Sequence, residues 1–379
     1  MLMRYRPGTG LDARILTAAE MRSRLSGWED LCRRSLEDSV YYTPRYAGAL
    51  LDTTASQDHP RFVTVSEGER LVALLPVETA RLPVPGLAAA GQAWMTDYTF
   101  STLPLIDRNL ASDAAGVLLE GLGQLSGGEW VFPAMTLDGP SARALTDAME
   151  LRGIPWAAAG DFTRATIARG PGFEEHLTER IGSKRRRELA RNRRRLEELG
   201  KVSHETHCNG AELNRAVQAF LDLETSGWKG RRGTALACDP ATRDFARAAF
   251  GDAGGQSICR ADLLLLDGKP IAAGLIVFAG RTGFTVKGAY DERYARYGAG
   301  LLLEMEVLRS FLEEGWADRL DAATAGEHVI DQLWPGRMRV GSLVFSLAPR
   351  GAALRLRSLT GVMAMKQQAK DTLKRLIKR

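Results

Sequence analysis

The chain reads, from residue 284 to residue 302, Phe284-Thr-Val-Lys-Gly-Ala-Tyr-Asp-Glu-Arg-Tyr-Ala-Arg-Tyr-Gly-Ala-Gly-Leu-Leu302. It begins with the residues of a strand and ends in a helix whose inner stripe is Leu301, Met305, Leu308 and Leu312. A strand that ends in a Gly-containing loop and enters a helix presents unpaired backbone N–H groups and the positive end of a helix dipole, which attract phosphate. The stretch therefore predicts either an anion-binding turn or a plain helix-entry loop.

The residues before and after this stretch predict an antiparallel sheet with a parallel addition. Residues 260–278 have the pattern of two strands joined by a tight turn at Asp267-Gly268, and a second turn at residues 280–283 leads into the next strand. Residues 319–323 predict a strand that lies parallel to strand 284–290, because a crossover helix connects the two. Residues 260–323 therefore predict a three-stranded meander followed by a βαβ crossover.

The first half of the chain has a similar order of elements. Residues 61–78 predict another hairpin, with Gly68 expected in the turn position that Gly268 occupies, and residues 110–125 predict the helix that corresponds to 301–315. We therefore expect two α+β domains of related plan, joined near residues 160–172.

Length and composition are those of an ordinary folded protein. The 379 residues are 45% hydrophobic and 26% charged, which suits about two domains and excludes a disordered chain. The 4 cysteines have no CxxC spacing and the 5 histidines no metal-ligand spacing, so we expect neither disulfides nor a metal site. The chain also has no apolar run of membrane-spanning length. We expect a cytoplasmic protein, and contact with the periphery of the inner membrane stays open.

Basic residues are concentrated in two segments, 180–201 and 366–379, although the net charge is only +5. The first segment predicts a helix with Leu189, Leu196 and Leu199 along an apolar edge and a broad basic face. That face is either solvated or captures an anionic substrate, cofactor, RNA or lipid. Aromatic residues are missing between the cations, so we expect a polyanionic or anionic-surface partner rather than duplex nucleic acid.

A carboxylate lies on the apolar stripe of a predicted helix that starts at Asn209 with a capping-box-like pattern and runs to about Thr225. This residue, Glu224, is either a general base whose pKa is raised by burial or the ion-pair partner of Lys229 or Lys287, and we favour pairing. The Gly-rich and basic residues 225–235 follow. They predict either an exposed basic loop with Trp228 in the core or a loop that closes over an anionic ligand.

Two further side chains of strand 284–290 are candidates for chemistry. Lys287 lies within apolar sequence, where a cation is costly unless it is paired or functional. Tyr290 ends the strand beside the Gly loop, where its phenol is placed to protonate a leaving group. Packing is an equally good explanation for Tyr290, Tyr294 and Tyr297.

The second half resembles the double-GNAT acyltransferases of the bacterial group that includes cellulose-biosynthesis acetyltransferase-like proteins, which are relatives of the Fem aminoacyltransferases. The resemblance rests on residues 183–196, 224–235 and 287–302, and on their order and spacing from about residue 175 to 345. The resemblance implies an α+β fold with two GNAT-like domains in tandem, each a mixed, mostly antiparallel sheet flanked by helices. The implied domains are a degenerate one at 1–170, an active one at 171–350 and a basic C-terminal helix at 351–379.

The resemblance also implies the reaction partners and the site. An acyl-CoA, acetyl-CoA or a longer one, is the implied donor, and its pyrophosphate binds the second half at Arg296, Gly298, Ala299, Gly300 and Leu301. The basic position of the GNAT phosphate motif falls on Ala295, one place before Arg296, which departs from the family pattern. The implied catalytic residues are Glu224, Tyr290 and Tyr297. The implied acceptor-binding residues are Trp228, Lys229, Arg231, Lys287 and Asp321.

The expected reaction is direct acyl transfer to an amine or hydroxyl of a small or polysaccharide-related acceptor, without a metal. A Fem-like transferase that takes aminoacyl-tRNA is the alternative enzyme, although the coiled-coil arm that serves tRNA in those proteins is missing from the sequence. An inactive binding module of polysaccharide-synthesis machinery is the alternative outside catalysis. We expect no specific nucleic-acid partner.

Overall fold

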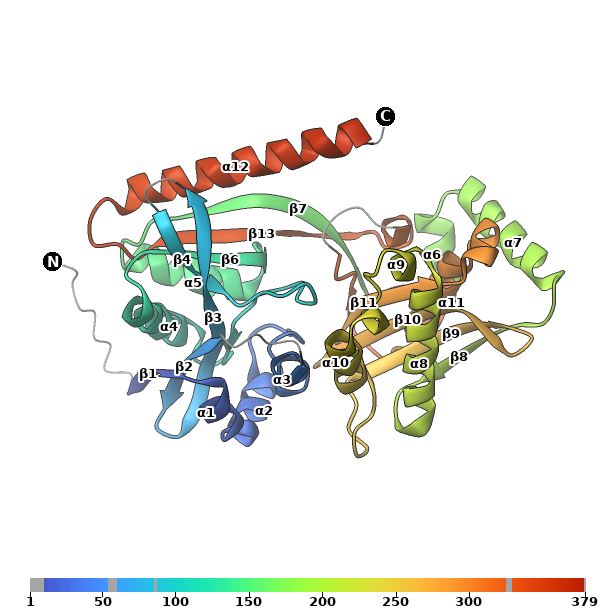
Figure 1. Ribbon diagram of the computed structural model, residues 1–379, viewed down its shortest axis with the longest axis horizontal. Helices are drawn as coiled ribbons and strands as arrows, with labels where there is room; N and C mark the ends of the chain where they lie inside the picture. Colours follow the sequence, from blue (N-terminus) through green and yellow to red (C-terminus); the bar gives the residue numbers. More distant parts are fainter. Residues whose placement is uncertain (1–9, 54–59, 85–86, 325–328, 378–379) are drawn as a thin grey trace. The chain divides into compact units, whose positions relative to one another are not determined.

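The computed structural model describes residues 10–53, 60–84, 87–324 and 329–377 (Figure 1). The chain separates into two compact units. Unit 1 holds the described parts of residues 1–44, 56–163 and 338–379, and unit 2 holds those of residues 45–55 and 164–337.

The strands of unit 1 follow the order β1 (Leu11–Leu16), β2 (Arg61–Glu67), β3 (Arg70–Val84), β4 (Leu87–Ala93), β6 (Glu129–Thr136) and β13 (Gly336–Ser346). Strands β1 to β4 are antiparallel, β6 is parallel to β4, and β13 is antiparallel to β6. The short β5 (Leu105–Ile106) pairs with β3. The helices are α1 (Ala18–Arg22), α2 (Leu25–Arg34), α4 (Ala111–Leu125), α5 (Pro140–Leu151) and α12 (Ala352–Ile377).

Unit 2 repeats this plan with β8 (Val202–His207), β9 (Cys259–Leu266), β10 (Lys269–Ala279), β11 (Thr282–Tyr290), β12 (Arg319–Asp321) and β7 (Trp156–Ala168). Strands β8 to β11 are antiparallel, β12 is parallel to β11, and β7 is antiparallel to β12. The helices are α3 (Pro44–Thr53), α6 (Phe173–Arg180), α7 (Ser183–Glu197), α8 (Gly210–Ser226), α9 (Trp228–Arg231), α10 (Pro240–Phe250) and α11 (Ala299–Glu314). Three short 3₁₀ turns are η1 (Leu236–Cys238), η2 (Glu292–Tyr297) and η3 (Val329–Gln332).

A large mixed sheet flanked by helices confirms the predicted α+β fold, and the two units have related strand orders within that sheet. The sixth strand of each plan spans a sequence boundary between the units. Strand β7 spans the boundary at residues 163 and 164, and β13 spans the boundary at residues 337 and 338. The predicted join at 160–172 falls on the end of β7 and the loop after it.

The two hairpins form as predicted, but their turns differ. Strand pairing leaves Gly68 and Glu69 in the first turn and Asp267 and Gly268 in the second. Gly68 (φ 56°) is the first turn residue, whereas Gly268 (φ 74°) is the second and follows Asp267 (φ 50°). The expectation that both glycines occupy the same turn position is therefore wrong. In the first turn Gly68 has a positive φ, whereas in the second turn both Asp267 and Gly268 have one.

Two helices cover opposite faces of the unit 2 sheet. Leu264 and Leu266 of β9 are buried with Leu302 and Leu303 of α11. The intervening β9 side chains point to the other face, because side chains alternate along a strand. Helix α8, which also packs on β9 and β10, covers that face.

Two details of the predicted helices are wrong. The N-cap residue of α8, Asn209, makes no side-chain cap, and the Gly210 N–H instead donates to Asp252 Oδ2 at 2.6 Å. The basic segment 180–201 is not one helix, because α6 ends at Arg180 and α7 runs from Ser183 to Glu197. Leu189 and Leu196 are buried as expected, but Leu199 follows the helix and is 47% exposed.

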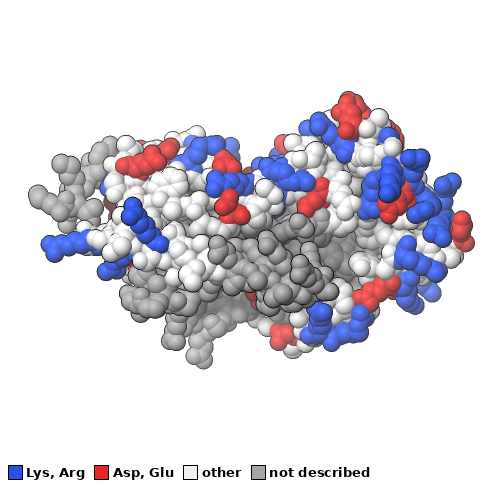
Figure 2. Space-filling model, turned by 90° about the horizontal axis from the view of Figure 1, so that it is seen from above, with Lys and Arg blue, Asp and Glu red and all other residues white. Residues whose placement is uncertain are grey.

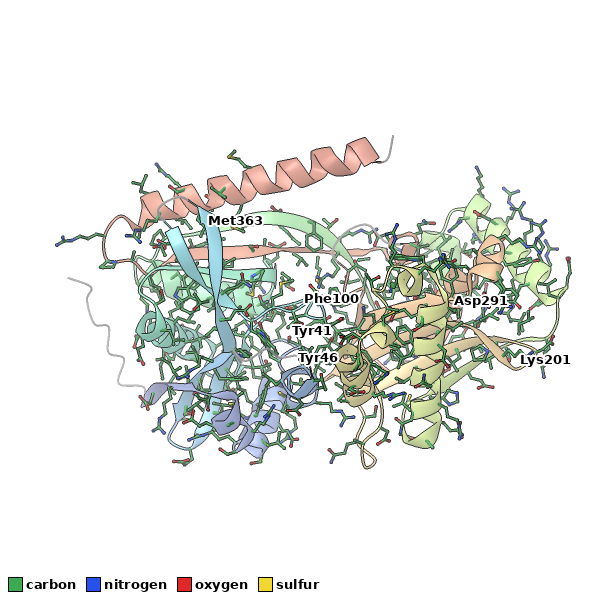
Figure 3. The ribbon with its side chains drawn as sticks, in the orientation of Figure 1. Tyr41, Tyr46, Phe100, Lys201, Asp291 and Met363 are labelled. Atoms are coloured by element: carbon green, nitrogen blue, oxygen red, sulfur yellow. The ribbon has the colours of Figure 1, made fainter. Side chains whose placement is uncertain are left out.

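Helix α12 packs on unit 1 through Leu356, Leu359, Val362 and Met363, which join Val131 and Val344 of the sheet (Figure 3). The basic side chains predicted at 366–379 lie outside the described side chains. Among the described residues, no helix combines the length and apolar character needed to cross a bilayer.

Candidate active site

Strands β11 and β12 part at the centre of unit 2. They pair only from Thr282 to Phe284, after which β12 ends at Asp321 and β11 continues to Tyr290. No strand in the described part of the chain pairs with this last stretch of β11 on the β12 side. The edge therefore offers backbone N–H and C=O groups to a ligand.

The loop after β11 leads directly into α11, as predicted. Asp291 caps η2 by accepting the N–H of Arg293 at 3.0 Å (Figure 3). Hydrogen bonds from the Arg293 guanidinium, and then this backbone N–H and the Arg293 charge, lower the pKa of Asp291. Gly298 then adopts φ 67° and ψ 39°, a left-handed conformation that favours glycine. Helix α11 starts at Ala299 without a side-chain cap, so the N–H groups of its first turn are available to an anion.

Of the two candidate tyrosines, only Tyr290 presents its ring to solvent. Tyr290 is 41% exposed and lies against Gly300, where an added Cβ would be 3.2 Å from the ring. Tyr297 is 7% exposed, and its hydroxyl accepts a hydrogen bond from Arg296 Nη2 at 2.6 Å. The Arg296 guanidinium also lies 4.7 Å from the centre of the Tyr297 ring. Tyr290 is therefore accessible to a ligand, whereas Tyr297 is buried.

Glu224 forms the ion pair that the sequence analysis favoured. Its carboxylate is 3% exposed, and Oε1 lies 2.8 Å from Lys229 Nζ while Oε2 accepts the Leu236 N–H at 2.8 Å. Both oxygens are thus engaged in holding the segment after α8. Lys287, the other partner considered for Glu224, belongs to β11 and is partly exposed. It lies opposite Leu275 of the neighbouring strand β10.

A residue that the sequence analysis missed joins the two predicted loops. Glu292 Oε1 accepts the Trp228 N–H at 2.8 Å, and Oε2 pairs with Arg231 Nη2 at 2.7 Å. The Arg231 guanidinium is the main cause that lowers the pKa of Glu292, with the Trp228 N–H next. Trp228 is 47% exposed rather than a core residue. Glu292 therefore holds α9 beside η2, a contact that no local pattern in the sequence indicates.

Asp321 is a candidate at the end of β12 and does not belong to residues 290–301 at the junction of β11 and α11, which we call the donor loop. Its side chain is buried, lies 3.6 Å from Arg164 Nη1 and accepts the Ala323 N–H at 2.8 Å. These contacts fix the end of β12 at the point where β11 and β12 part.

Beneath α11, a buried polar network ties the helix to the sheet. Asp262 accepts hydrogen bonds from Arg260 and Thr206 and is bonded to His204, and Arg260 also donates to Ser310 of α11 at 2.8 Å. Burial alone would raise the pKa of Asp262, but these hydrogen bonds and the Arg260 charge hold it below its usual value. The network therefore fixes α11, the helix that follows the donor loop.

Glu304 lies one turn into α11 and was also missed. Its Oε2 has no surface in contact with water and no hydrogen-bond partner. Burial, and then the nearby charge of Asp262, raise the pKa of Glu304 to about 7. This carboxyl group therefore changes charge near neutral pH.

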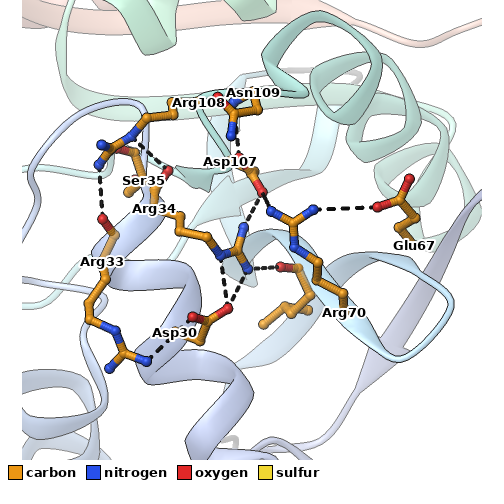
Figure 4. A network of polar contacts seen from close by, with 10 residues as sticks. Asp30, Arg33, Arg34, Ser35, Glu67, Arg70, Asp107, Arg108 and Asn109 are labelled. Atoms are coloured by element: carbon orange, nitrogen blue, oxygen red, sulfur yellow. Dashed lines mark hydrogen bonds and ion pairs between the residues drawn. The ribbon is translucent and has the colours of Figure 1, made fainter.

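The corresponding junction in unit 1 is built differently (Figure 4). Helix α4 is preceded by a buried carboxylate, Asp107, which pairs with Arg34 and with Arg70 Nη2, the latter at 2.8 Å, and accepts the Asn109 N–H at 2.9 Å. Two arginines therefore neutralise the carboxylate before this helix, whereas the donor loop is built on Gly298 and Gly300. The expectation that only the second half binds the donor stays a prediction.

Comparison with known proteins agrees with this geometry. Residues 183–328 match the protein family described as "Acetyltransferase (GNAT) domain". Unit 2 contains a GNAT acetyltransferase domain. This match assigns a GNAT-type acyltransferase fold to residues 183–328. A search of curated proteins found no match.

Solved structures share the fold at low sequence identity. The structure of FemX is similar with a TM-score of 0.55 at 10% identity, covering 84% of this chain and 95% of that chain. The C-terminal domain (DUF2156) of a putative lysylphosphatidylglycerol synthetase from Agrobacterium fabrum has a TM-score of 0.52 at 13% identity, with coverages of 90% and 96%. A tandem GNAT protein from the clavulanic acid biosynthesis pathway has a TM-score of 0.44 at 11% identity, with coverages of 89% and 99%. The resemblance to the cellulose-biosynthesis group in particular stays a prediction.

Proposed function

We propose that unit 2 transfers an acyl group from acyl-CoA to an amine or hydroxyl acceptor. The observation that carries this proposal is the parting of β11 and β12 directly before a glycine loop and an uncapped helix N-terminus. A thioester lying along the free edge of β11 would have its pyrophosphate at the first turn of α11. The residues present fit this donor, because Gly298 and Gly300 keep side chains away from that turn.

The acceptor attacks the thioester carbonyl directly in this proposal. Backbone N–H groups on the free edge of β11 stabilise the oxyanion, and Tyr290 gives its proton to the departing thiolate. The proton that the acceptor releases returns to the Tyr290 phenolate by way of water. Tyr290 suits this role better than Tyr297 because its ring is exposed beside the donor loop. Glu224 acts through Lys229 and the Leu236 N–H to shape the acceptor side, rather than as the base.

The acceptor side is formed by α9 and the residues around it. Trp228 is exposed there, and Arg232 lies 5.2 Å from the centre of its ring. An aromatic face and several cations suit a sugar or small molecule that carries a negative group. The sequence resemblance to the cellulose-biosynthesis group supports a polysaccharide-related acceptor.

Calorimetric titration with CoA and acetyl-CoA tests the donor assignment. The wild-type protein is expected to bind both, and Gly300→Val is expected to weaken binding by about tenfold or more, because the side chain would crowd Tyr290 and the first turn of α11. Gly27→Val in α2 is the matched control, since nothing lies within 4 Å of an added Cβ there.

Unchanged CoA affinity in Gly300→Val would remove the pyrophosphate assignment. Turnover that requires an aminoacyl-tRNA instead of acyl-CoA would favour the Fem-like alternative. Absence of any donor binding in the wild-type protein would favour the binding module.

A further inference from the structure

Glu304 of α11 carries a carboxyl group that the proposed reaction leaves unused. Its Oε2 has no surface in contact with water and no hydrogen-bond partner among the described residues. Burial, and then the charge of Asp262, raise the pKa of Glu304, and no described cation offsets them. A buried polar atom without a partner is costly, so this carboxyl group needs an explanation.

The neighbours of Glu304 around the helix axis show that its side chain faces β11. Leu303, on one side of it, is buried with Ile276 of β10. Leu308, on the other side, is buried with Leu320 of β12. Strand β11 lies between β10 and β12 in the sheet, so the part of α11 between these two leucines lies over β11.

The contact between Gly300 and Tyr290 places Glu304 along β11. Glu304 lies one helical turn, about 6 Å, beyond Gly300, which is packed against the Tyr290 ring. Helix α11 connects the parallel strands β11 and β12, so it runs in the direction opposite to β11. A step of about 6 Å against the strand direction covers two residues of β11. Glu304 therefore lies over Gly288, on the free edge of β11.

Two glycines leave room in the sheet beneath Glu304. Gly288 lies directly opposite Gly274 of β10, so both face the same side of the sheet. A Cβ added to Gly274 would be 3.6 Å from the Leu303 side chain, so this is the side that α11 covers. Of the described atoms, a Cβ added to Gly288 would meet the Ala273 carbonyl oxygen alone, at 3.9 Å. A small group attached to a thioester on the free edge of β11 can therefore enter here.

The polar surroundings of this position are negative. Asp262 lies opposite Gly274 on its other side, and its oxygens already accept hydrogen bonds from Arg260 and Thr206. Lys and Arg side chains gather instead on the outer surface of unit 2 (Figure 2). The described residues beneath α11 thus provide Glu304 Oε2 with neither a cation nor a hydrogen-bond donor.

We propose that Glu304 selects the acyl group of the donor by accepting a hydrogen bond from a hydroxyl or amine a few bonds from the thioester carbonyl. This inference rests on the proposed function. An apolar acyl group of the same size would leave the buried carboxyl unpaired, and sites of this kind discriminate strongly against such analogues. The donor class is therefore a short, polar acyl-CoA.

The test measures kcat/KM of the full-length protein for three donors of equal size, with hydroxylamine as the acceptor. The donors β-alanyl-CoA, 3-hydroxypropionyl-CoA and butyryl-CoA carry an amine, a hydroxyl and a methyl group at the same place. The set one carbon shorter, glycyl-CoA, glycoloyl-CoA and propionyl-CoA, covers a closer approach to Glu304. The wild-type protein is expected to prefer a polar donor over its apolar counterpart by about 10²-fold or more.

Three variants of α11 assign the preference to Glu304. Glu304→Leu is expected to lose it, because no polar atom is left to accept the hydrogen bond. Glu304→Gln keeps an acceptor without a charge, so it should keep a preference for the hydroxyl and lose one for the amine. Glu313→Leu makes the same substitution at an exposed position of the helix and should keep the wild-type preference. Melting temperatures check that each variant is folded.

The outcomes separate this inference from the proposed function. Turnover of none of the six donors by the wild-type protein would contradict the proposed function. Similar turnover of polar and apolar donors, or faster turnover of the apolar ones, overturns the inference alone. A preference that persists in Glu304→Leu overturns it as well. A preference for β-alanyl-CoA or glycyl-CoA supports the amine, and one for 3-hydroxypropionyl-CoA or glycoloyl-CoA supports the hydroxyl.

Discussion

At the residue scale, the two tyrosines of the donor loop give a matched pair. Tyr290→Phe is expected to lower kcat about 10²-fold, since it removes the proton donor but keeps the ring beside Gly300. Tyr297→Phe removes only a buried hydroxyl that accepts a hydrogen bond from Arg296, so kcat should stay within a few-fold of the wild-type value. Release of the CoA thiol from acetyl-CoA, with hydroxylamine as a small acceptor, measures both. A larger loss in Tyr297→Phe would reverse the assignment.

Glu224 belongs to the same scale, and its prediction concerns stability. Glu224→Gln should lower the free energy of unfolding by roughly 1–3 kcal/mol, because the buried contacts to Lys229 and the Leu236 N–H weaken. Activity at temperatures where the variant is folded should change little. Urea unfolding and kcat are the two readouts, and adding Lys229→Met should recover part of the stability. An unchanged melting temperature with kcat reduced by about 10² to 10⁴ would instead make Glu224 a general base.

Glu304 predicts a pH dependence of stability. Its pKa in the folded protein is about 7, above the ordinary value, so between these two values the folded state binds more protons than the unfolded state. The stability of the wild-type protein should therefore fall as pH rises from about 4.5 to 7. The side chain of Glu304→Gln cannot ionise, so by pH 8 the free energy of unfolding of this variant should rise relative to the wild type by about 1–3 kcal/mol.

Urea unfolding at pH 5 and pH 8 measures this effect of Glu304. Glu313→Gln, which changes a carboxylate later in the same helix, is the control and should follow the wild-type profile. Identical pH profiles for the wild type and Glu304→Gln would show that Glu304 is not the titrating group.

At the scale of elements, the contact between η2 and α9 decides whether the donor and acceptor loops act together. Glu292→Ala removes the acceptor of the Trp228 N–H and the partner of Arg231, so residues 227–234 should exchange hydrogen for deuterium faster. Arg231→Ala should have a similar but smaller effect. Arg293→Ala, whose exposed side chain pairs with Asp291 instead, is the control. No change in exchange in Glu292→Ala would mean that α9 is held by other contacts.

Local elements were predictable because their patterns are local. Alternation and turn residues predict β9, β10 and β11, and the apolar stripe of α11 together with the Gly298 loop is visible in one short stretch. The start of α8 was predicted correctly, but its capping contact was not, because the partner of the Gly210 N–H is Asp252, about 40 residues away. The prediction that Leu199 lies on the apolar edge of the helix was wrong because α7 ends at Glu197. The apolar spacing of the sequence continues to Leu199, but the helix does not.

At the scale of the whole molecule, the two related plans were predictable and the return of the chain to unit 1 through β13 was not. The order of hairpin and helix repeats along the sequence, but nothing local indicates that β13 completes unit 1 and β7 completes unit 2. The predicted boundaries 1–170, 171–350 and 351–379 stay a prediction, and the compact units are discontinuous in sequence. The Glu292 bridge and the Asp107 network were missed for the same reason, since each joins residues far apart along the chain.

Hydrogen–deuterium exchange with and without acetyl-CoA tests most directly the claim that unit 2 binds the donor where β11 and β12 part. We expect slower exchange in residues 285–303, which span the free edge of β11 and the first turn of α11, and no change in residues 105–118 of unit 1. Slower exchange confined to unit 1, or acetyl-CoA binding that leaves residues 285–303 unaffected, would contradict it.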